Sequence, residues 1–201
     1  MDNNQFLQAA AKRRSIYALG NRLNVDDEQI IATVKEAVHQ APSAFNSQPI
    51  RVAILLNDAH QKFWNQTKDI LHQVMTHKEK FPQTAAKIDT FAAGHGTVLF
   101  FRDEETVQNA KEQFKSYADN FDDWTEEAVG IAVYSVWTAL ASLQIGASIQ
   151  HYNPLVDEWV HQEFNIPKHF VLRGEMPFGS IESPAGAKEF LTDDKVFKVI
   201  N

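Results

Sequence analysis

Cysteine is absent from this chain of 201 residues. Its absence excludes disulfides, thiolate catalysis and cysteine-based zinc or iron–sulfur sites. Long apolar runs are absent too, since no stretch approaches the roughly 20 apolar residues that span a bilayer. The first eleven residues include Asp2, Gln5 and Gln8 and lack the apolar core of a signal peptide. We therefore expect a cytoplasmic protein with no membrane partner.

The formal net charge of the chain is −7, and nothing in the sequence suggests an extended surface of clustered lysines and arginines. Nucleic acids and anionic membranes require such clusters, so we expect neither partner. Apolar residues make up 44% of the chain and charged residues 22%, which is typical of a globular protein. With no repeat or low-complexity linker in view, this length predicts one domain over residues 1–201.

Several well-known catalytic motifs are missing as well. No G-x-G-x-x-G follows a predicted strand, which argues against a Rossmann dinucleotide site. The chain has no P-loop, no G-x-S-x-G nucleophile elbow and no H-E-x-x-H zinc motif. Glu158 and His161 have a spacing that can place two metal ligands together, but a single pair is more typical of a solvated helix face. We predict no metal site.

The hydrophobic pattern predicts an irregular mixture of helices and strands. Helices are expected at residues 3–14, from a cap at Asp26 or Asp27 through Val38, and at 59–75, 104–117, 125–143 and 158–164. Strands are expected at 51–56, 97–101, 147–150, 170–173 and 195–200. This order favours an α+β fold, a sheet flanked by helices, over a doubly wound parallel sheet.

The segment 125–143 is apolar on almost every face. A helix without a polar face must be enclosed by protein. The sequence leaves two possibilities, the middle of the chain's own core or a flank that packs on a second subunit.

Four segments carry groups that could bind a ligand. Lys12-Arg13-Arg14-Ser15 either complements the helix dipole or forms an anion site. Residues 42–49 form either an ordinary turn or a loop that covers a flat heterocycle. Residues 150–154 follow a predicted strand, where polar side chains line a site or cap a turn. Residues 176–179 predict a turn, and Lys188 adds a cation.

Together these segments resemble one known family. The runs RRSIYALG, APSAFNSQP, VWTALASLQIGASIQHYNP and MPFG occur in this order. The pattern is similar to the nitroreductase family, in the branch of small bacterial nitroreductases and fungal fatty-acid-regulated nitroreductase-like proteins. The resemblance runs from about residue 10 to the last predicted strand.

The resemblance implies an α+β fold with a central, mostly antiparallel sheet flanked by helices, in an intertwined homodimer. It also implies two FMN sites at the subunit interface. Arg13, Arg14 and Ser15 would hold the phosphate, the ribityl chain and the ring edge, with Lys188 on the phosphate. The other subunit would cover the ring with Pro42, Ser43, Ala44, Phe45 and Asn46, and with Gln48 as a further contact. Gln150, His151 and Tyr152 would lie near the pyrimidine and N5 side.

The chain departs from the family pattern at two of these places. Tyr17 stands where many relatives have an arginine, and Glu189 follows Lys188 where many have a second base. A carboxylate beside the lysine would weaken phosphate binding unless it points away.

The activity implied is ping-pong hydride transfer from NADH or NADPH, through flavin N5, to a nitroaromatic, a quinone or a similar small aromatic acceptor. The flavin supplies this chemistry, so no catalytic acid or base is expected among the side chains. Arg14 is the candidate for stabilising the reduced flavin. Two alternatives stay open: a flavin-binding sensor with little turnover, and another reaction on the same fold, such as reductive dehalogenation or flavin breakdown.

Overall fold

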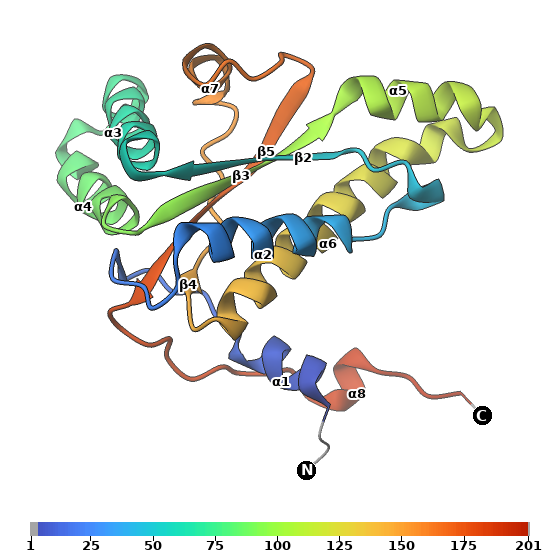
Figure 1. Ribbon diagram of the computed structural model, residues 1–201, viewed down its shortest axis with the longest axis horizontal. Coiled ribbons are helices and arrows are strands. Elements are labelled where there is room, and N and C mark those ends of the chain that lie inside the picture. Colours follow the sequence, from blue (N-terminus) through green and yellow to red (C-terminus); the bar gives the residue numbers. More distant parts are fainter. Residues whose placement is uncertain (1–3, 201) are drawn as a thin grey trace.

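The computed structural model describes residues 4–200, and a five-stranded sheet forms its centre (Figure 1). The strand order is β1-β5-β3-β2, and β4 also pairs with β5. Every pairing between these strands is antiparallel. The strands are β1 Leu19–Gly20, β2 Ile50–Leu56, β3 Gly96–Asp103, β4 Gly146–Ala147 and β5 Phe170–Ile181. The predicted α+β fold with a mostly antiparallel sheet is confirmed.

Helices connect and cover these strands. They are α1 Gln5–Lys12, α2 Asp27–His39, α3 Asn57–Val74, α4 Phe81–Ala92, α5 Glu104–Gln113, α6 Phe121–Ser142, α7 Asp157–Glu163 and α8 Asp193–Val196, with short 3₁₀ turns η1 Ala44–Asn46, η2 Lys78–Lys80 and η3 Lys115–Asn120. Of the two caps considered for α2, Asp26 is the one used, because its side chain accepts the Gln29 N–H at 2.8 Å.

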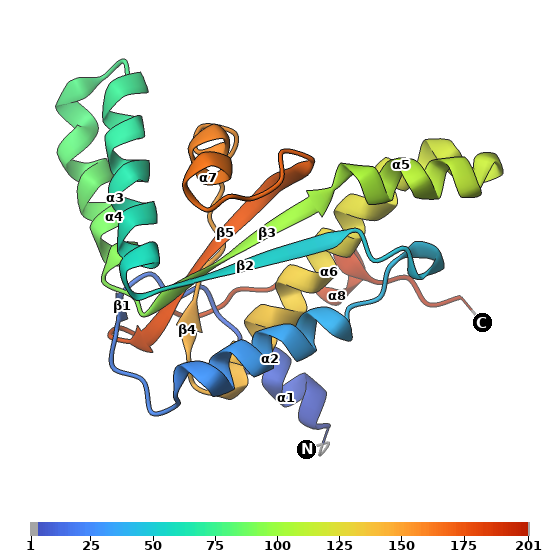
Figure 2. The ribbon, with the colours of Figure 1, turned by 45° about the horizontal axis from the view of Figure 1, so that its top comes forward.

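The two faces of the sheet carry separate hydrophobic clusters. In β3, Val98 and Phe100 pack toward α2 and α6, whereas Leu99 and Phe101 pack toward α3, α4 and α7. Alternate residues of a strand point to opposite faces, so a strand covered on both sides is apolar throughout. Figure 2 shows α3, α4 and α7 on one side of the sheet and α2 and α6 on the other.

Of the two possibilities that its sequence left open for helix α6, the structure shows packing in the chain's own core, and packing on a second subunit stays a prediction. Val136 and Leu140 lie in the chain's own core against the sheet. On another flank Ile131 and Tyr134 are 40% and 37% exposed. The chain's own core therefore encloses part of the helix and leaves an apolar flank open.

Strand β5 corrects two predictions. Residues 176–179 form no turn but continue the strand, so β5 reaches Ile181. The Pro177 carbonyl accepts the Ser148 N–H at 3.3 Å and so points to the β4 side of the strand. The Pro177 nitrogen points to the same side, away from β3, so the missing N–H removes no hydrogen bond to β3. Regular pairing is interrupted on that side, since β4 ends at Ala147 and pairing resumes only at the Gln150–Glu175 bridge. The predicted strand 147–150 is therefore largely irregular.

The two ends of the chain also differ from prediction. The first helix ends at Lys12 and not at residue 14, and predicted residue 3 lies outside the described part. The predicted strand 195–200 is wrong, because Asp193 and Asp194 begin the short helix α8 and the residues after it pair with no described strand. Helix α4 was not predicted, although Pro82 in its first turn and the spacing of Ile88 and Phe91 are typical of a helix.

None of the helices between residues 4 and 200 combines the length and the apolar composition needed to cross a bilayer.

Candidate functional site

The arginine-rich segment after α1 is extended backbone that runs beside β4. Arg13 caps the helix in an extended conformation. Ser15 forms an isolated parallel bridge with Ala147, and the Ile16 N–H donates to the Ala147 carbonyl at 2.9 Å. These contacts hold residues 13–16 against the central sheet, although the segment belongs to no long strand.

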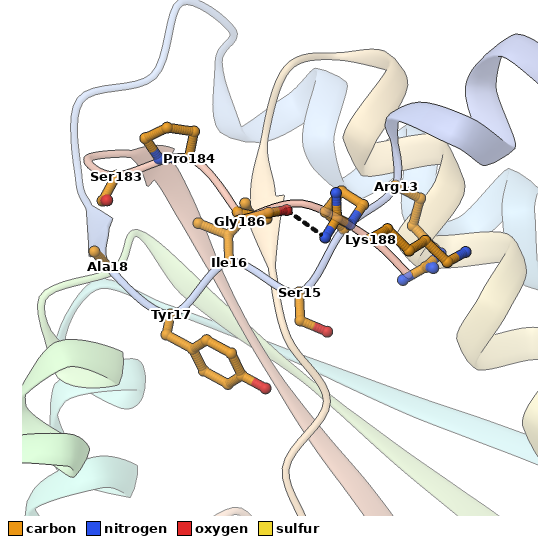
Figure 3. Close-up of a pocket in the computed structure, with 11 residues that line it drawn as sticks. Arg13, Ser15, Ile16, Tyr17, Ala18, Ser183, Pro184, Gly186 and Lys188 are labelled. Atoms are coloured by element: carbon orange, nitrogen blue, oxygen red, sulfur yellow. Dashed lines mark hydrogen bonds between the residues drawn. The ribbon is translucent and has the colours of Figure 1, made fainter. Parts of the chain in front are cut away.

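This segment forms one wall of a cavity of about 550 Å³. Ligand sites in proteins commonly measure about 300–1,000 Å³. The cavity contains Arg13, Arg14 and Ser15 from one segment and Ser183–Gly186 and Lys188 from the chain after β5, with the Tyr17 ring alongside (Figure 3). Among the residues that the structure describes, three cations and no carboxylate line it. The predicted Arg13, Arg14, Ser15 and Lys188 therefore lie together around an electropositive hollow.

The two arginines are held in different ways. The Arg13 guanidinium lies over the Trp137 ring, 4.5 Å from its centroid, and its Nε is buried without a hydrogen-bond partner among the described residues. Arg14 Nη2 donates to the Gly186 carbonyl at 2.8 Å, which ties the chain after β5 to this segment (Figure 3). Guanidinium forks and an ammonium group bind phosphate oxygens well, so the cavity fits a phosphate monoester.

The predicted covering loop, residues 42–48, is fixed in a strained conformation. Phe45, Asn46 and Gln48 have φ values of 53°, 51° and 50°. Residues other than glycine rarely adopt this left-handed region, and backbone strain of this kind is found most often at functional sites. The Ser43 hydroxyl accepts the Gln48 N–H at 2.9 Å, and the half-exposed Phe45 ring stacks on Phe114 with centroids 4.2 Å apart. The loop thus presents an aromatic ring and amides from a fixed backbone.

Within the described chain this loop does not join the arginine cavity. Pro42, Ser43 and Gln48 line a cavity of about 260 Å³, and Pro42, Ser43 and Ala44 line another of about 300 Å³. Neither cavity includes Arg13, Arg14 or Lys188. The residues predicted for one cofactor site therefore form two separate groups in a single chain.

The third predicted segment lies at the edge of β5. Gln150 is buried, its backbone pairs with Glu175, and its Nε2 donates to the Ser148 hydroxyl at 3.1 Å. The Tyr152 ring packs edge-on against Trp64, with centroids 5.7 Å apart. His151 between them is exposed. Gln150 and Tyr152 thus turn inward, and of the three side chains His151 is the one most open to a ligand.

Glu175 is a candidate functional residue that no motif in the sequence indicated. It is fully buried, and its carboxylate accepts the Tyr152 N–H at 2.9 Å and the Asn153 N–H at 3.2 Å. Burial raises the pKa of Glu175 to about 8, although both hydrogen bonds oppose the shift. Burial, helped by the Glu175 charge, raises the pKa of Tyr152 to about 12. The signal in the sequence was a lone acid directly before the apolar residues Met176, Pro177 and Phe178.

The spaced pair on α7 has other partners. Glu158 Oε1 accepts from Gln162 Nε2 at 2.6 Å, and His161 Nδ1 lies 3.2 Å from the Ile166 carbonyl. Between residues 4 and 200 no group of three or more histidine and acidic side chains is placed to hold a metal.

Comparison with known proteins identifies the family. The Nitroreductase family profile matches residues 10–180. The Saccharomyces cerevisiae nitroreductase FRM2 is 27% identical over 190 residues, which cover 94% of each chain.

Solved structures agree with that match. Nitroreductase CinD from Lactococcus lactis, in complex with chloramphenicol, is 48% identical, has a TM-score of 0.88 and covers 98% of this chain and 100% of its own. CinD has also been solved with 4-nitrophenol. A nitroreductase with bound FMN from Desulfitobacterium hafniense, 18% identical, shares the fold with a TM-score of 0.72 and covers 99% of this chain and 100% of its own. The chain belongs to the nitroreductase family.

Proposed function

We propose that this protein is an FMN-dependent oxidoreductase. The observation that carries the proposal is the electropositive cavity, in which Arg13, Arg14, Ser15 and Lys188 meet around a space suited to a phosphate monoester. Arg13 and Lys188 would bind the phosphate, and the Ser15 hydroxyl would bind the ribityl chain. Family membership and the FMN-bound relative support this choice of cofactor.

The substrates proposed are NADH or NADPH as electron donor and a small nitroaromatic or quinone as acceptor, bound in turn. CinD, the 48% identical relative, has been solved with two nitroaromatic compounds, chloramphenicol and 4-nitrophenol. When bound, FMN supplies hydride transfer through its N5 atom. The chain's own residues would bind and orient the cofactor, and Arg14 would place a positive charge near the ring edge.

We propose further that the protein works as a homodimer. Several large apolar side chains of the C-terminal segment are more than half exposed, namely Phe190, Leu191, Val196, Phe197, Val199 and Ile200. The open flank of α6, with Ile131 and Tyr134, is a second apolar surface. A second copy that covers both would also bring residues 42–46 toward the arginine cavity, which lacks them in one chain.

The extent of this unit and its location are part of the same proposal. One sheet with clusters on both faces supports a single FMN-binding domain over residues 1–201, and limited proteolysis that leaves one resistant fragment would support it. A cytoplasmic location stays a prediction, to be checked by cell fractionation.

The test is the visible spectrum of the purified protein before and after anaerobic addition of NADH, then NADPH. We expect flavin absorption that bleaches with one donor and returns with 4-nitrophenol or a quinone. Arg13→Ala should lower the flavin content. Arg22→Ala, which removes an exposed arginine outside the cavity lining, is the matched control.

Each other outcome contradicts a defined part of the proposal. Flavin that neither donor bleaches would leave a flavin-binding protein and overturn the redox activity. A protein that stays colourless after incubation with FMN would overturn the cofactor. A monomer in analytical ultracentrifugation, with full flavin content, would overturn the shared site.

A further inference from the structure

Trp137 on α6 is linked to the arginine segment in two ways, directly through the Arg13 guanidinium and indirectly through the Ala147 carbonyl of β4. Its ring lies under the Arg13 guanidinium, 4.5 Å from centroid to Cζ, and the Tyr134 ring lies 6.0 Å from the same guanidinium. A guanidinium within about 6 Å of an aromatic ring is attracted by the ring's negative face. Trp137 therefore gives the Arg13 head group a plane to lie on.

The second contact fixes the backbone behind Arg13. Trp137 Nε1 donates to the Ala147 carbonyl at 3.2 Å, and the same carbonyl accepts the Ile16 N–H at 2.9 Å. One oxygen of β4 thus links the indole to the segment that contains Arg13 and Ser15. The ring and the backbone of the segment are set relative to one another from two sides.

The Arg13 head group is otherwise weakly restrained. Its Nε is buried without a hydrogen-bond partner in the described residues. Arg14 differs, because the Gly186 carbonyl holds its guanidinium. The orientation of Arg13 therefore depends on stacking more than on hydrogen bonds from the protein.

We infer that Trp137 is the positioning residue that orients Arg13 for the phosphate of the cofactor. This inference rests on the proposed function. Trp137 would touch Arg13 but not the reacting atoms, and it would make the site select a phosphorylated flavin over an unphosphorylated one. A planar cation kept in place by an aromatic face loses less conformational freedom when it binds a phosphate.

The test compares FMN with riboflavin, which has the same ring but no phosphate. Flavin-free protein is titrated with each compound, and binding is followed by the loss of flavin fluorescence. We expect Trp137→Leu to weaken FMN binding by up to about tenfold, the order expected when a long side chain must be ordered on binding, and to change riboflavin binding less than twofold. Trp137→Phe keeps a ring face and should restore most of the selectivity.

Two further variants separate positioning from packing. Trp159→Leu removes another half-buried tryptophan, packed against Phe63 and Phe164 away from the cavity, and should leave the ratio of the two affinities unchanged. In the background of Arg13→Ala, Trp137→Leu should have no further effect on that ratio, because the two residues act through one contact.

The outcomes are distinguishable. Equal weakening of FMN and riboflavin in Trp137→Leu would show a packing role and overturn the inference. So would a full effect of Trp137→Leu in the absence of the Arg13 guanidinium. A wild-type protein that binds neither flavin would overturn the proposed function, and this inference with it.

Discussion

The buried carboxylate of Glu175 predicts an unusual dependence of stability on pH. Glu175 lies on the central strand β5, fully buried, and holds the Tyr152 and Asn153 N–H groups. Its pKa is raised from 4.5 to about 8 by burial, with a further contribution from the charge of Asp157. Folding therefore favours the protonated form of this side chain.

The sign follows from proton binding in the two states. Between pH 4.5 and 8 the folded protein retains the Glu175 proton while the unfolded chain loses it, so stability falls as pH rises. The stability that protonated Glu175 contributes is fully present below pH 4.5. It is lost as the pH rises through the pKa of about 8 in the folded protein. Between pH 5 and pH 8 the free energy of unfolding should decrease by about 3 kcal/mol on this account. Glu175→Gln cannot ionise and should lose this slope.

The assay is urea unfolding of wild type and Glu175→Gln across that pH range. The difference between them is the informative quantity, because His60 acts oppositely. Burial lowers the pKa of His60 to about 4, so its contribution is present above pH 6.5 and is lost as pH falls toward 4 in both proteins. Glu112→Gln, an exposed carboxylate in α5, is the control and should keep the wild-type slope. If Glu175→Gln and wild type differ by a constant amount from pH 5 to pH 8, the reasoning is refuted.

Three further predictions concern single contacts. Thr97→Val should lower the free energy of unfolding by about 2–4 kcal/mol in urea, because the buried hydroxyl bonds both Trp64 Nε1 and His60 at 2.8 Å, and a loss below 1 kcal/mol would contradict this. Arg102→Met breaks ion pairs with Glu104, Asp122 and Glu126 and should cost about 2 kcal/mol, less at high salt; a loss that salt does not change would count against a charge effect. Glu189→Lys should raise FMN affinity by about two- to fivefold at low salt, because it replaces an exposed carboxylate beside Lys188 with a second cation. Unchanged affinity in a fluorescence titration would show that Glu189 points away from the phosphate.

The central strand β3 was predictable because the residues of a buried strand are apolar, and this shows in the local sequence. Val98, Leu99, Phe100 and Phe101 are all buried, alternately on two faces, and such an apolar run is typical of an interior strand. The terminal residues 195–200 show a similar pattern without a partner strand. A strand depends on its neighbour, which local sequence does not reveal, so the same kind of pattern was correct in one place and wrong in the other.

The site was predictable in its parts and not in its assembly. Arg13 and Lys188 lie 175 positions apart in the sequence, and the course of the chain after β5 brings them together. No local pattern encodes that approach, so only resemblance connected the two residues. Glu175 escaped because a single acid in a strand is typical of a solvated edge. Its hydrogen-bond partners, the N–H groups of Tyr152 and Asn153, are more than 20 residues away in the sequence.

Helix α6 explains why the two groups of predicted site residues differ within one chain. Val136 anchors the helix to the sheet, and Trp137, one residue later, meets Arg13. The arginine end of the cavity is therefore fixed by the chain's own core. Within one chain, loop 42–48 contributes no residue to that cavity. A few residues before Trp137, the α6 side chains Ile131 and Tyr134 are exposed to solvent. Selection for the phosphate should consequently survive in a monomer, whereas cover over the flavin ring should require a second copy.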